Sequence, residues 1–81
     1  MKFKVEMRAF QQGVIREVDV PDRLIPNPQK VEVEAMLDLI YYYGQNDIQV
    51  VPERCSVSVG DVIQLNGKKY KVEMLGFGEV K

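Results

Sequence analysis

The chain has 81 residues, and a polypeptide of this length buries a single hydrophobic core, so residues 1–81 are expected to form one domain. Hydrophobic residues make up 46% and charged residues 28% of the sequence, a balance that is typical of a globular domain and excludes a disordered chain. The formal net charge of −1 combines both signs along the sequence, without the run of Lys and Arg that marks a general nucleic-acid-binding protein.

The inventory of reactive side chains excludes several function classes. There is no histidine, which removes the commonest general base and the commonest metal ligand. Cys55 is the only cysteine, so it forms neither an internal disulfide nor a thiolate zinc site; beside Arg54 it is either a reactive thiol or a half-buried small residue. No apolar run approaches the ~20 residues of a membrane-spanning helix. We therefore expect a cytoplasmic protein that is not an enzyme, with no metal, no cofactor and no membrane segment.

The N-terminal quarter predicts an antiparallel hairpin. Residues 3–9 alternate between an apolar and a charged face, which is the period of a half-buried strand. The sequence QQG at 11–13 supplies a turn, and a second alternating strand runs from Val14 to Val20. Arg16 falls on the apolar side of this strand, so its side chain must either reach solvent or find a partner.

A connector and a helix follow. Residues 21–29 cannot continue a sheet, because two prolines within three residues remove hydrogen-bond donors. Asn27 is a favourable cap and Pro28 a favourable first residue for a helix over about 28–43, although the alternation KVEVE at 30–34 leaves a later start open.

The predicted helix is amphipathic. On a helical wheel centred on Val33, the buried face collects Met36, Leu37 and Ile40. Gly44 is expected to end the helix in the left-handed conformation that glycine adopts readily.

Alternation returns after the helix. IQVV at 48–51 predicts a short strand ended by Pro52, and SVSV at 56–59 alternates again. The clearest local pattern lies in residues 61–75, where Asn66-Gly67 between two alternating segments predicts a two-residue hairpin loop that pairs Leu65 with Lys68 and Ile63 with Tyr70. The buried face of this hairpin is expected to hold Ile63, Leu65, Tyr70, Val72 and Met74, and the outer face Val62, Gln64, Lys69, Lys71 and Glu73.

These segments predict an α+β fold of order β-β-α-β-β-β, in which one helix packs on an antiparallel sheet that is either open or curled into a small, partly open barrel.

The sequence VSVGDVIQLNGKKYKV resembles a pattern common in small β-barrels, where Gly60 permits a tight bend and Asp61 bonds backbone N–H groups. Such barrels bind RNA elsewhere. The alternative function is therefore nucleic-acid binding, and its candidate residues are Lys68, Lys69 and Lys71. Tyr70 is predicted to point inward, which leaves these lysines without a stacking partner and makes nucleic acid the less favoured partner.

The stretch YYYGQND at 41–47 is the main candidate for a contact site. Tyr41 and Tyr43 flank the core face of the helix and are assigned to the edge of the core. Tyr42 points away from the sheet, and the short polar residues after Gly44 supply adaptable hydrogen bonds, as in many interfaces. The candidate partner-binding residues are Tyr42, Gln45, Asn46 and Asp47. The other interpretation is that the polar residues only close the loop through Asx-type bonds.

Together with SVSVGDVI at 56–63 and LGFGEV at 75–80, YYYGQND resembles short proteins encoded by bacteriophages and other bacterial mobile elements, to which no activity is attached. The resemblance implies a bacterial cytoplasm, including that of an infected host, and a bacterial protein as partner, because small non-catalytic phage proteins commonly bind host proteins. A homodimer is also expected, because the core is small and Tyr42 and the sheet edges are predicted to be exposed.

Overall fold

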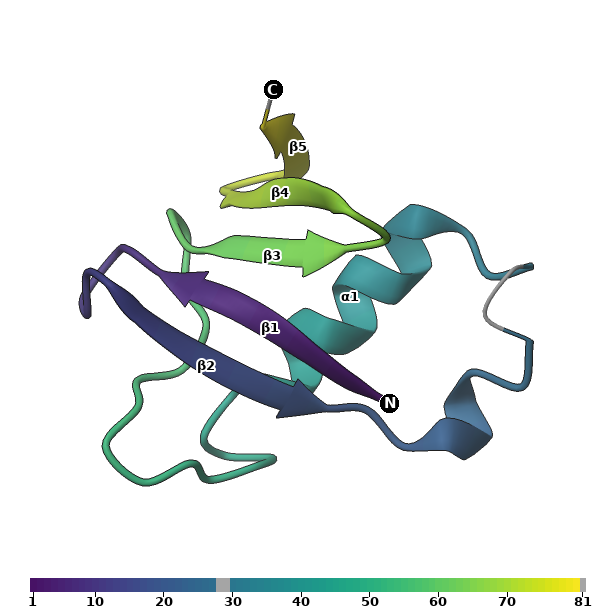
Figure 1. Ribbon diagram of the computed structural model, residues 1–81, viewed down its shortest axis with the longest axis horizontal. Coiled ribbons are helices and arrows are strands. Elements are labelled where there is room, and N and C mark those ends of the chain that lie inside the picture. Colours follow the sequence, from purple (N-terminus) through teal and green to yellow (C-terminus); the bar gives the residue numbers. More distant parts are fainter. Residues whose placement is uncertain (28–29, 81) are drawn as a thin grey trace.

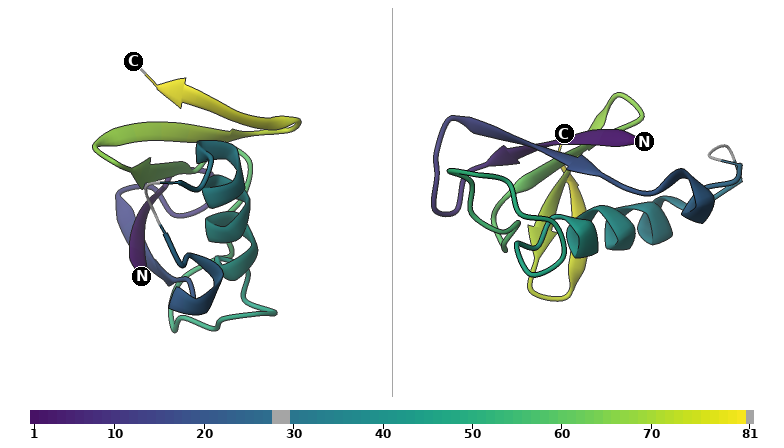
Figure 2. Two further views of the ribbon diagram at one scale, coloured as in Figure 1. Left: turned by 90° about the vertical axis from the view of Figure 1, so that its right-hand side faces the viewer. Right: turned by 90° about the horizontal axis from the view of Figure 1, so that it is seen from below.

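A computed structural model describes residues 1–27 and 30–80. It confirms the α+β class: a five-stranded antiparallel sheet in the order β2-β1-β3-β4-β5 carries helix α1 on one face (Figure 1). The sheet is open and does not close into a barrel, so β2 and β5 are its two edges. Two further views place α1 and the loop that follows it on the same side of the sheet (Figure 2). No helix within the described residues is both long and apolar enough to cross a membrane.

The predicted N-terminal hairpin is confirmed. Strand β1 (Lys2–Met7) pairs with β2 (Val14–Asp19) in a register that runs from Lys2↔Asp19 to Met7↔Val14. The alternation buries one face of each strand and exposes the other, as expected, and the exposed face is charged apart from Ile15. A short 3-10 helix, η1 (Asp22–Leu24), follows β2, and Ile25 then enters the core.

Helix α1 (Val33–Tyr43) buries Met36, Leu37 and Ile40, as the wheel predicts. The helix does not start at Asn27 but later, as the alternation at 30–34 left open, and Pro28 lies outside the described residues. Val31 packs against the core from outside the helix, and Glu32 has an extended backbone that prevents the helix from beginning earlier. Val33 is consequently exposed at the first turn, where we expected the centre of the buried face.

Gly44 corrects a second expectation about this helix. Its φ of −80° and ψ of 2° are not left-handed, so the predicted C-terminal conformation is wrong. Glycine is required there for a different reason: a Cβ atom on Gly44 would lie 2.5 Å from Cγ2 of Val57. The end of α1 and the following loop therefore meet so closely that a side chain at position 44 would overlap with Val57 unless one of the two shifts.

The hairpin of β3 (Val62–Leu65) and β4 (Lys68–Glu73) has the predicted register, with Leu65↔Lys68 and Ile63↔Tyr70. Asn66 and Gly67 have φ values of 53° and 76°, as a turn with two left-handed positions requires.

Two residues of this region differ from the prediction in their burial. Met74 is exposed because it occupies the turn into β5 (Gly76–Val80), where the ladder with β4 has ended. Val62 is buried on the outer face, between its cross-strand neighbours Glu6 and Lys71, whose side chains are long.

The strands predicted at 48–51 and 56–59 are not formed. Residues 44–61 make one long loop, because many of their backbone groups bond to side chains or to α1 instead of a sheet ladder. The third strand after the helix is β5, whose glycine-rich sequence GFGEV carries no alternation that predicts a strand.

Asp61 acts as scaffold at the start of β3. Its Oδ1 accepts hydrogen bonds from the backbone N–H groups of Arg8 and Ala9, and Oδ2 accepts one from Ser58, each at 2.8 Å. Gly60 precedes it with a φ of +103°. The fully buried carboxylate therefore joins the end of β1 to the bend before β3, and it bonds backbone N–H groups as expected.

Candidate interaction surfaces

The polar residues of YYYGQND are turned largely toward the protein itself. The Gln45 side-chain amide donates to the carbonyl oxygens of Tyr41 and Val57, both at 2.9 Å. The backbone N–H of Asn46 donates to Ser56 Oγ at 2.8 Å. Gln45 and Asn46 thus close the loop after α1, which agrees with the second of the two interpretations of this stretch.

The loop is also held by the buried side chain of Arg16, which is 0% exposed. Its Nη1 donates to Asn46 Oδ1 at 2.8 Å and to the carbonyl oxygen of Cys55 at 2.7 Å, and its Nη2 donates to the carbonyl oxygen of Gln49. Burial lowers the pKa of the guanidinium below its ordinary value. Arg16 is therefore paired inside the protein, and three neutral oxygens compensate its charge.

Tyr42 and Asp47 remain on the surface. Tyr42 is 53% exposed, and its ring packs edge-on against Tyr43 with the centroids 5.1 Å apart. Tyr41 and Tyr43 are half-buried against the core, as predicted, and Tyr41 makes an edge contact with Phe77 at 6.4 Å. Of the four candidate contact residues, the structure thus leaves Tyr42 and Asp47 with exposed side chains.

A second apolar region lies at the turn between β4 and β5. Met74 and Leu75 form the tip of this turn and are 87% and 97% exposed. Behind the tip is a hollow of about 220 Å³ between α1, the bend at Val59 and the β4–β5 hairpin. We call this region the hairpin surface, and its members are Asp38, Tyr41, Val59, Met74, Leu75 and Phe77.

Helix geometry connects Tyr42 with the hairpin surface. Asp38 and Tyr42 are four residues apart on α1, so they project from the same side of the helix one turn apart. The sequence interpretation missed the hairpin surface because it placed Met74 in the core. The glycine in the sequence Met-Leu-Gly could have indicated a turn there, because glycine readily adopts the positive φ that a tight turn needs. In the structure, Gly76 has a φ of +97°.

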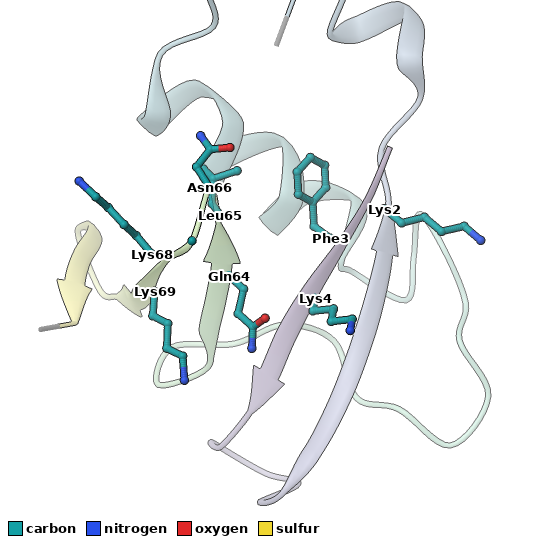
Figure 3. A pocket seen from close by; sticks show the side chains of 9 residues that line it. Lys2, Phe3, Lys4, Gln64, Leu65, Asn66, Lys68 and Lys69 are labelled. Atoms are coloured by element: carbon teal, nitrogen blue, oxygen red, sulfur yellow. The ribbon is translucent and has the colours of Figure 1, made fainter. Parts of the chain in front are cut away.

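The larger hollow, about 420 Å³, lies on the opposite part of the sheet, where β1 and β3 separate (Figure 3). Their ladder joins Val5 with Ile63 and Glu6 with Val62, and it does not continue to the ends of the strands. We call this hollow the lysine groove. Its lining includes four lysines above two apolar side chains: Lys2, Lys4, Lys68 and Lys69, with Phe3 and Leu65.

The lysines of this groove do not converge on a common point. Figure 3 shows Lys2 and Lys68 pointing away from each other to opposite sides of the groove. Lys69 Nζ lies 2.9 Å from Glu6 Oε2, and Lys2 Nζ lies 3.6 Å from Glu17 Oε1. Of the three candidate nucleic-acid residues, Lys68 and Lys69 line the groove, and Lys71 lies on the outer face of β4.

Glu6 is the most perturbed carboxylate of this region. Hydrogen bonds from Lys69, Gln64 and Arg8, in decreasing order of effect, lower the pKa of Glu6 to about 2. Glu6 is therefore ionised at neutral pH and offsets part of the positive charge of the groove.

Comparisons of the chain with protein-family models, with curated proteins and with solved structures gave no match. Within residues 1–27 and 30–80, no three Cys, Asp or Glu side chains come together in a way that would hold a metal ion.

Proposed function

We propose that this protein is a non-catalytic interaction module and that the hairpin surface contacts a protein partner. The observation that supports it is the exposure of Met74 and Leu75 at a turn, where they add nothing to the core. Contiguous exposed apolar side chains beside a hollow are typical of protein-binding sites, and aromatic and methionine side chains are enriched there. Tyr42, one helical turn from Asp38, extends the surface along α1, and we propose it again as a partner-binding residue.

The resemblance to phage and mobile-element proteins supports a bacterial protein as the partner and a bacterial cytoplasm as the setting. Nucleic-acid binding through Lys68, Lys69 and Lys71 is the alternative. It is less favoured because Lys69 is paired with Glu6 and because the lysines of the groove diverge. A gel shift at low and moderate salt separates the two functions, since tight binding that weakens steeply with salt is the mark of phosphate contacts.

The test compares variants of two exposed apolar sites. A partner is captured from bacterial lysate, identified and purified, and its affinity is then measured for the wild type and for the double variant Met74→Ser/Leu75→Ser. The matched control is Phe10→Ser, because Phe10 is 76% exposed in the turn between β1 and β2 and does not line the hollow of the hairpin surface. We expect the double variant to lose ~10-fold or more in affinity, as interface anchors do, while Phe10→Ser binds like the wild type.

Thermal melts accompany these measurements. All three serine substitutions and Tyr42→Ala should leave the free energy of unfolding within ~0.5 kcal/mol of the wild type, because the side chains are exposed. Ile40→Ala, which removes a buried side chain, should lower the free energy of unfolding by about 2–4 kcal/mol. It shows how large a shift in melting temperature the loss of a core side chain produces. Equal affinity of the double variant and the wild type would contradict the proposed function of the hairpin surface.

A further inference from the structure

The two edges of the sheet differ in how their backbone groups are used. At the β2 edge, Arg54 Nε donates to the carbonyl oxygen of Ile15 at 3.1 Å. The side-chain amide of Gln49 bonds both backbone groups of Asp19: its Nε2 donates to the carbonyl oxygen at 2.8 Å, and its Oε1 accepts from the N–H at 3.0 Å. The loop after α1 therefore occupies the β2 edge with side chains, which blocks further strand pairing there.

The β5 edge is open. Val72 of β4 exchanges backbone hydrogen bonds with Gly60 and Asp61, so its polar groups face the β3 side. These directions alternate along an antiparallel strand, so Lys71 and Glu73, on either side of Val72, face β5 and pair with Gly78 and Gly76. By the same alternation, the N–H and C=O groups of Phe77 and Glu79 point away from β4, toward the open edge. Within the described part of the chain, no side chain bonds to these four groups.

The surroundings of this edge are acidic on both faces of the sheet. Glu79 is exposed on the edge itself. On the outer face, the carboxylate of Glu73 lies over Gly78, with Oε1 2.9 Å from the position that a Cβ atom on Gly78 would take. On the helix side, Asp38 lines the hollow of the hairpin surface. Lys71 and Lys69, which pair with Gly78 and Val80 in the ladder, are basic side chains beside them, and Lys69 is itself paired with Glu6.

An apolar site accompanies these charges. Phe77 and Met74 line the hollow that adjoins β5, together with Tyr41 and Val59. A strand laid along β5 would therefore meet main-chain donors and acceptors on its inner edge, carboxylates on either side and an apolar hollow near its end.

We propose that the β5 edge receives an extended segment of the partner protein as a sixth strand of the sheet, and that this segment alternates basic with apolar side chains. The proposal rests on the proposed function and adds the chemistry of the partner. Main-chain hydrogen bonds supply affinity in such strand addition, and alternate side chains supply specificity. A second copy of the chain complements this edge poorly, because its own β5 would place another Glu79 near the first.

The probe is a synthetic peptide of about seven residues, the length of an ordinary strand, in which lysine alternates with valine. A second peptide carries glutamate in place of lysine. A third is the lysine peptide with methyl groups on alternate backbone nitrogens, which removes the donors that would pair with β5. Titrations are followed by the NMR signals of the backbone amides of Phe77 and Glu79.

Two proline variants test the geometry. Glu79→Pro removes an outward N–H from β5 without removing a hydrogen bond to β4, and Glu17→Pro does the same on the β2 edge. Glu79→Ala removes the same carboxylate but keeps the N–H. Melting curves and NMR dispersion show whether each variant folds, and the methylated peptide gives the same test on the wild type if a variant does not.

We expect the lysine peptide to shift the Phe77 and Glu79 amides and to bind ~10-fold or more tightly than the glutamate peptide, since like charges oppose association. Glu79→Pro should weaken binding beyond the effect of Glu79→Ala, and Glu17→Pro should have no effect. Strand addition would be overturned if Glu79→Pro and Glu79→Ala lost the same amount of affinity. It would also be overturned if the methylated lysine peptide bound as tightly as the unmethylated one.

Two further outcomes overturn this inference and leave the proposed function intact. In the first, the purified partner depends on Met74 and Leu75 but binds Glu79→Pro like the wild type. In the second, Glu79→Pro abolishes a concentration-dependent dimer, which would show that β5 pairs with a second copy.

Discussion

At Gly44, the last turn of α1 and the loop that follows it come into direct contact. The backbone N–H of Val57 donates to the carbonyl oxygen of Gly44 at 3.0 Å, and the space for a side chain is already taken by the Cγ2 methyl group of Val57. Gly44, at the end of α1, thus sets how closely the helix and the loop approach each other.

Gly44→Ala should therefore destabilise the protein by about 1–3 kcal/mol, as overpacking of a core does. The cause would be overlap with Val57 and not a strained φ. Urea unfolding of Gly44→Ala, Val57→Ala and the double variant measures this directly. We expect the double variant to be more stable than the sum of the single effects predicts, because the smaller side chain relieves the overlap. Strictly additive losses would show that the two residues do not interact.

Glu6 supplies a pH-dependent contribution. Its pKa is lowered from 4.5 to about 2 in the folded protein, so folding favours the ionised carboxylate. The stabilisation is present above pH 4.5 and is lost as the pH falls through 2. Melting temperatures of the wild type and Glu6→Gln should therefore differ at pH 6 and converge toward pH 2. A difference that stays constant over this range would contradict the assignment.

At the scale of secondary-structure elements, Arg16 of β2 holds the loop of residues 44–61 in place. Arg16 reaches Asn46, Gln49 and Cys55, so one side chain fixes three points of the loop. Since Gln49 in turn occupies the β2 edge, the buried arginine also keeps that edge closed.

Arg16→Met should release the loop and cost about 3 kcal/mol or more, because three buried oxygens lose their donors. Amide hydrogen exchange should accelerate at Val57 and at Asp19, whose N–H groups bond to Gly44 and Gln49. Arg54→Met is the control, because Arg54 belongs to the same loop and its Nε makes a single exposed bond, to Ile15. Similar exchange in the two variants would refute the central role of Arg16.

The fold was predictable where the pattern is local. The alternation of β1, β2 and β4, the apolar stripe of α1 and the Asn66-Gly67 turn all depend on residues close in sequence. Residues 48–51 and 56–59 alternate in the same way, but Gln49 and Cys55 bond to Arg16, which is more than 30 positions away. Strand β5 was missed because its glycines carry no side-chain signal.

The candidate site was predictable to a similar extent. The exposure of Tyr42 follows from the helical wheel, which needs only neighbouring residues. The inward turn of Gln45 and Asn46 depends on Val57 and Arg16, whose positions come from the tertiary fold. The hairpin surface depends on β5 pairing with β4, which the sequence did not indicate.

At the scale of the whole molecule, the homodimer expected from the sequence stays a prediction. The β2 edge is occupied and the β5 edge is acidic, so the hairpin surface is the better contact for a second copy. Light scattering over a concentration series should then give twice the mass of one chain, and Met74→Ser/Leu75→Ser should give the mass of one chain. A wild type that is monomeric at the highest concentration would exclude the dimer.

The position of β1 inside the sheet, between β2 and β3, has a consequence for the order of folding. One neighbour of β1 is the adjacent hairpin strand, but the other is β3, and the Gln64–Glu6 hydrogen bond across that boundary joins residues 58 positions apart. A chain emerging from the ribosome can form the β1–β2 hairpin early, whereas the side of β1 that receives β3 stays open until about four-fifths of the protein has been made. Closing such a long loop is slow, so we expect folding in milliseconds to seconds, with the joining of β3 to β1 as the committed step.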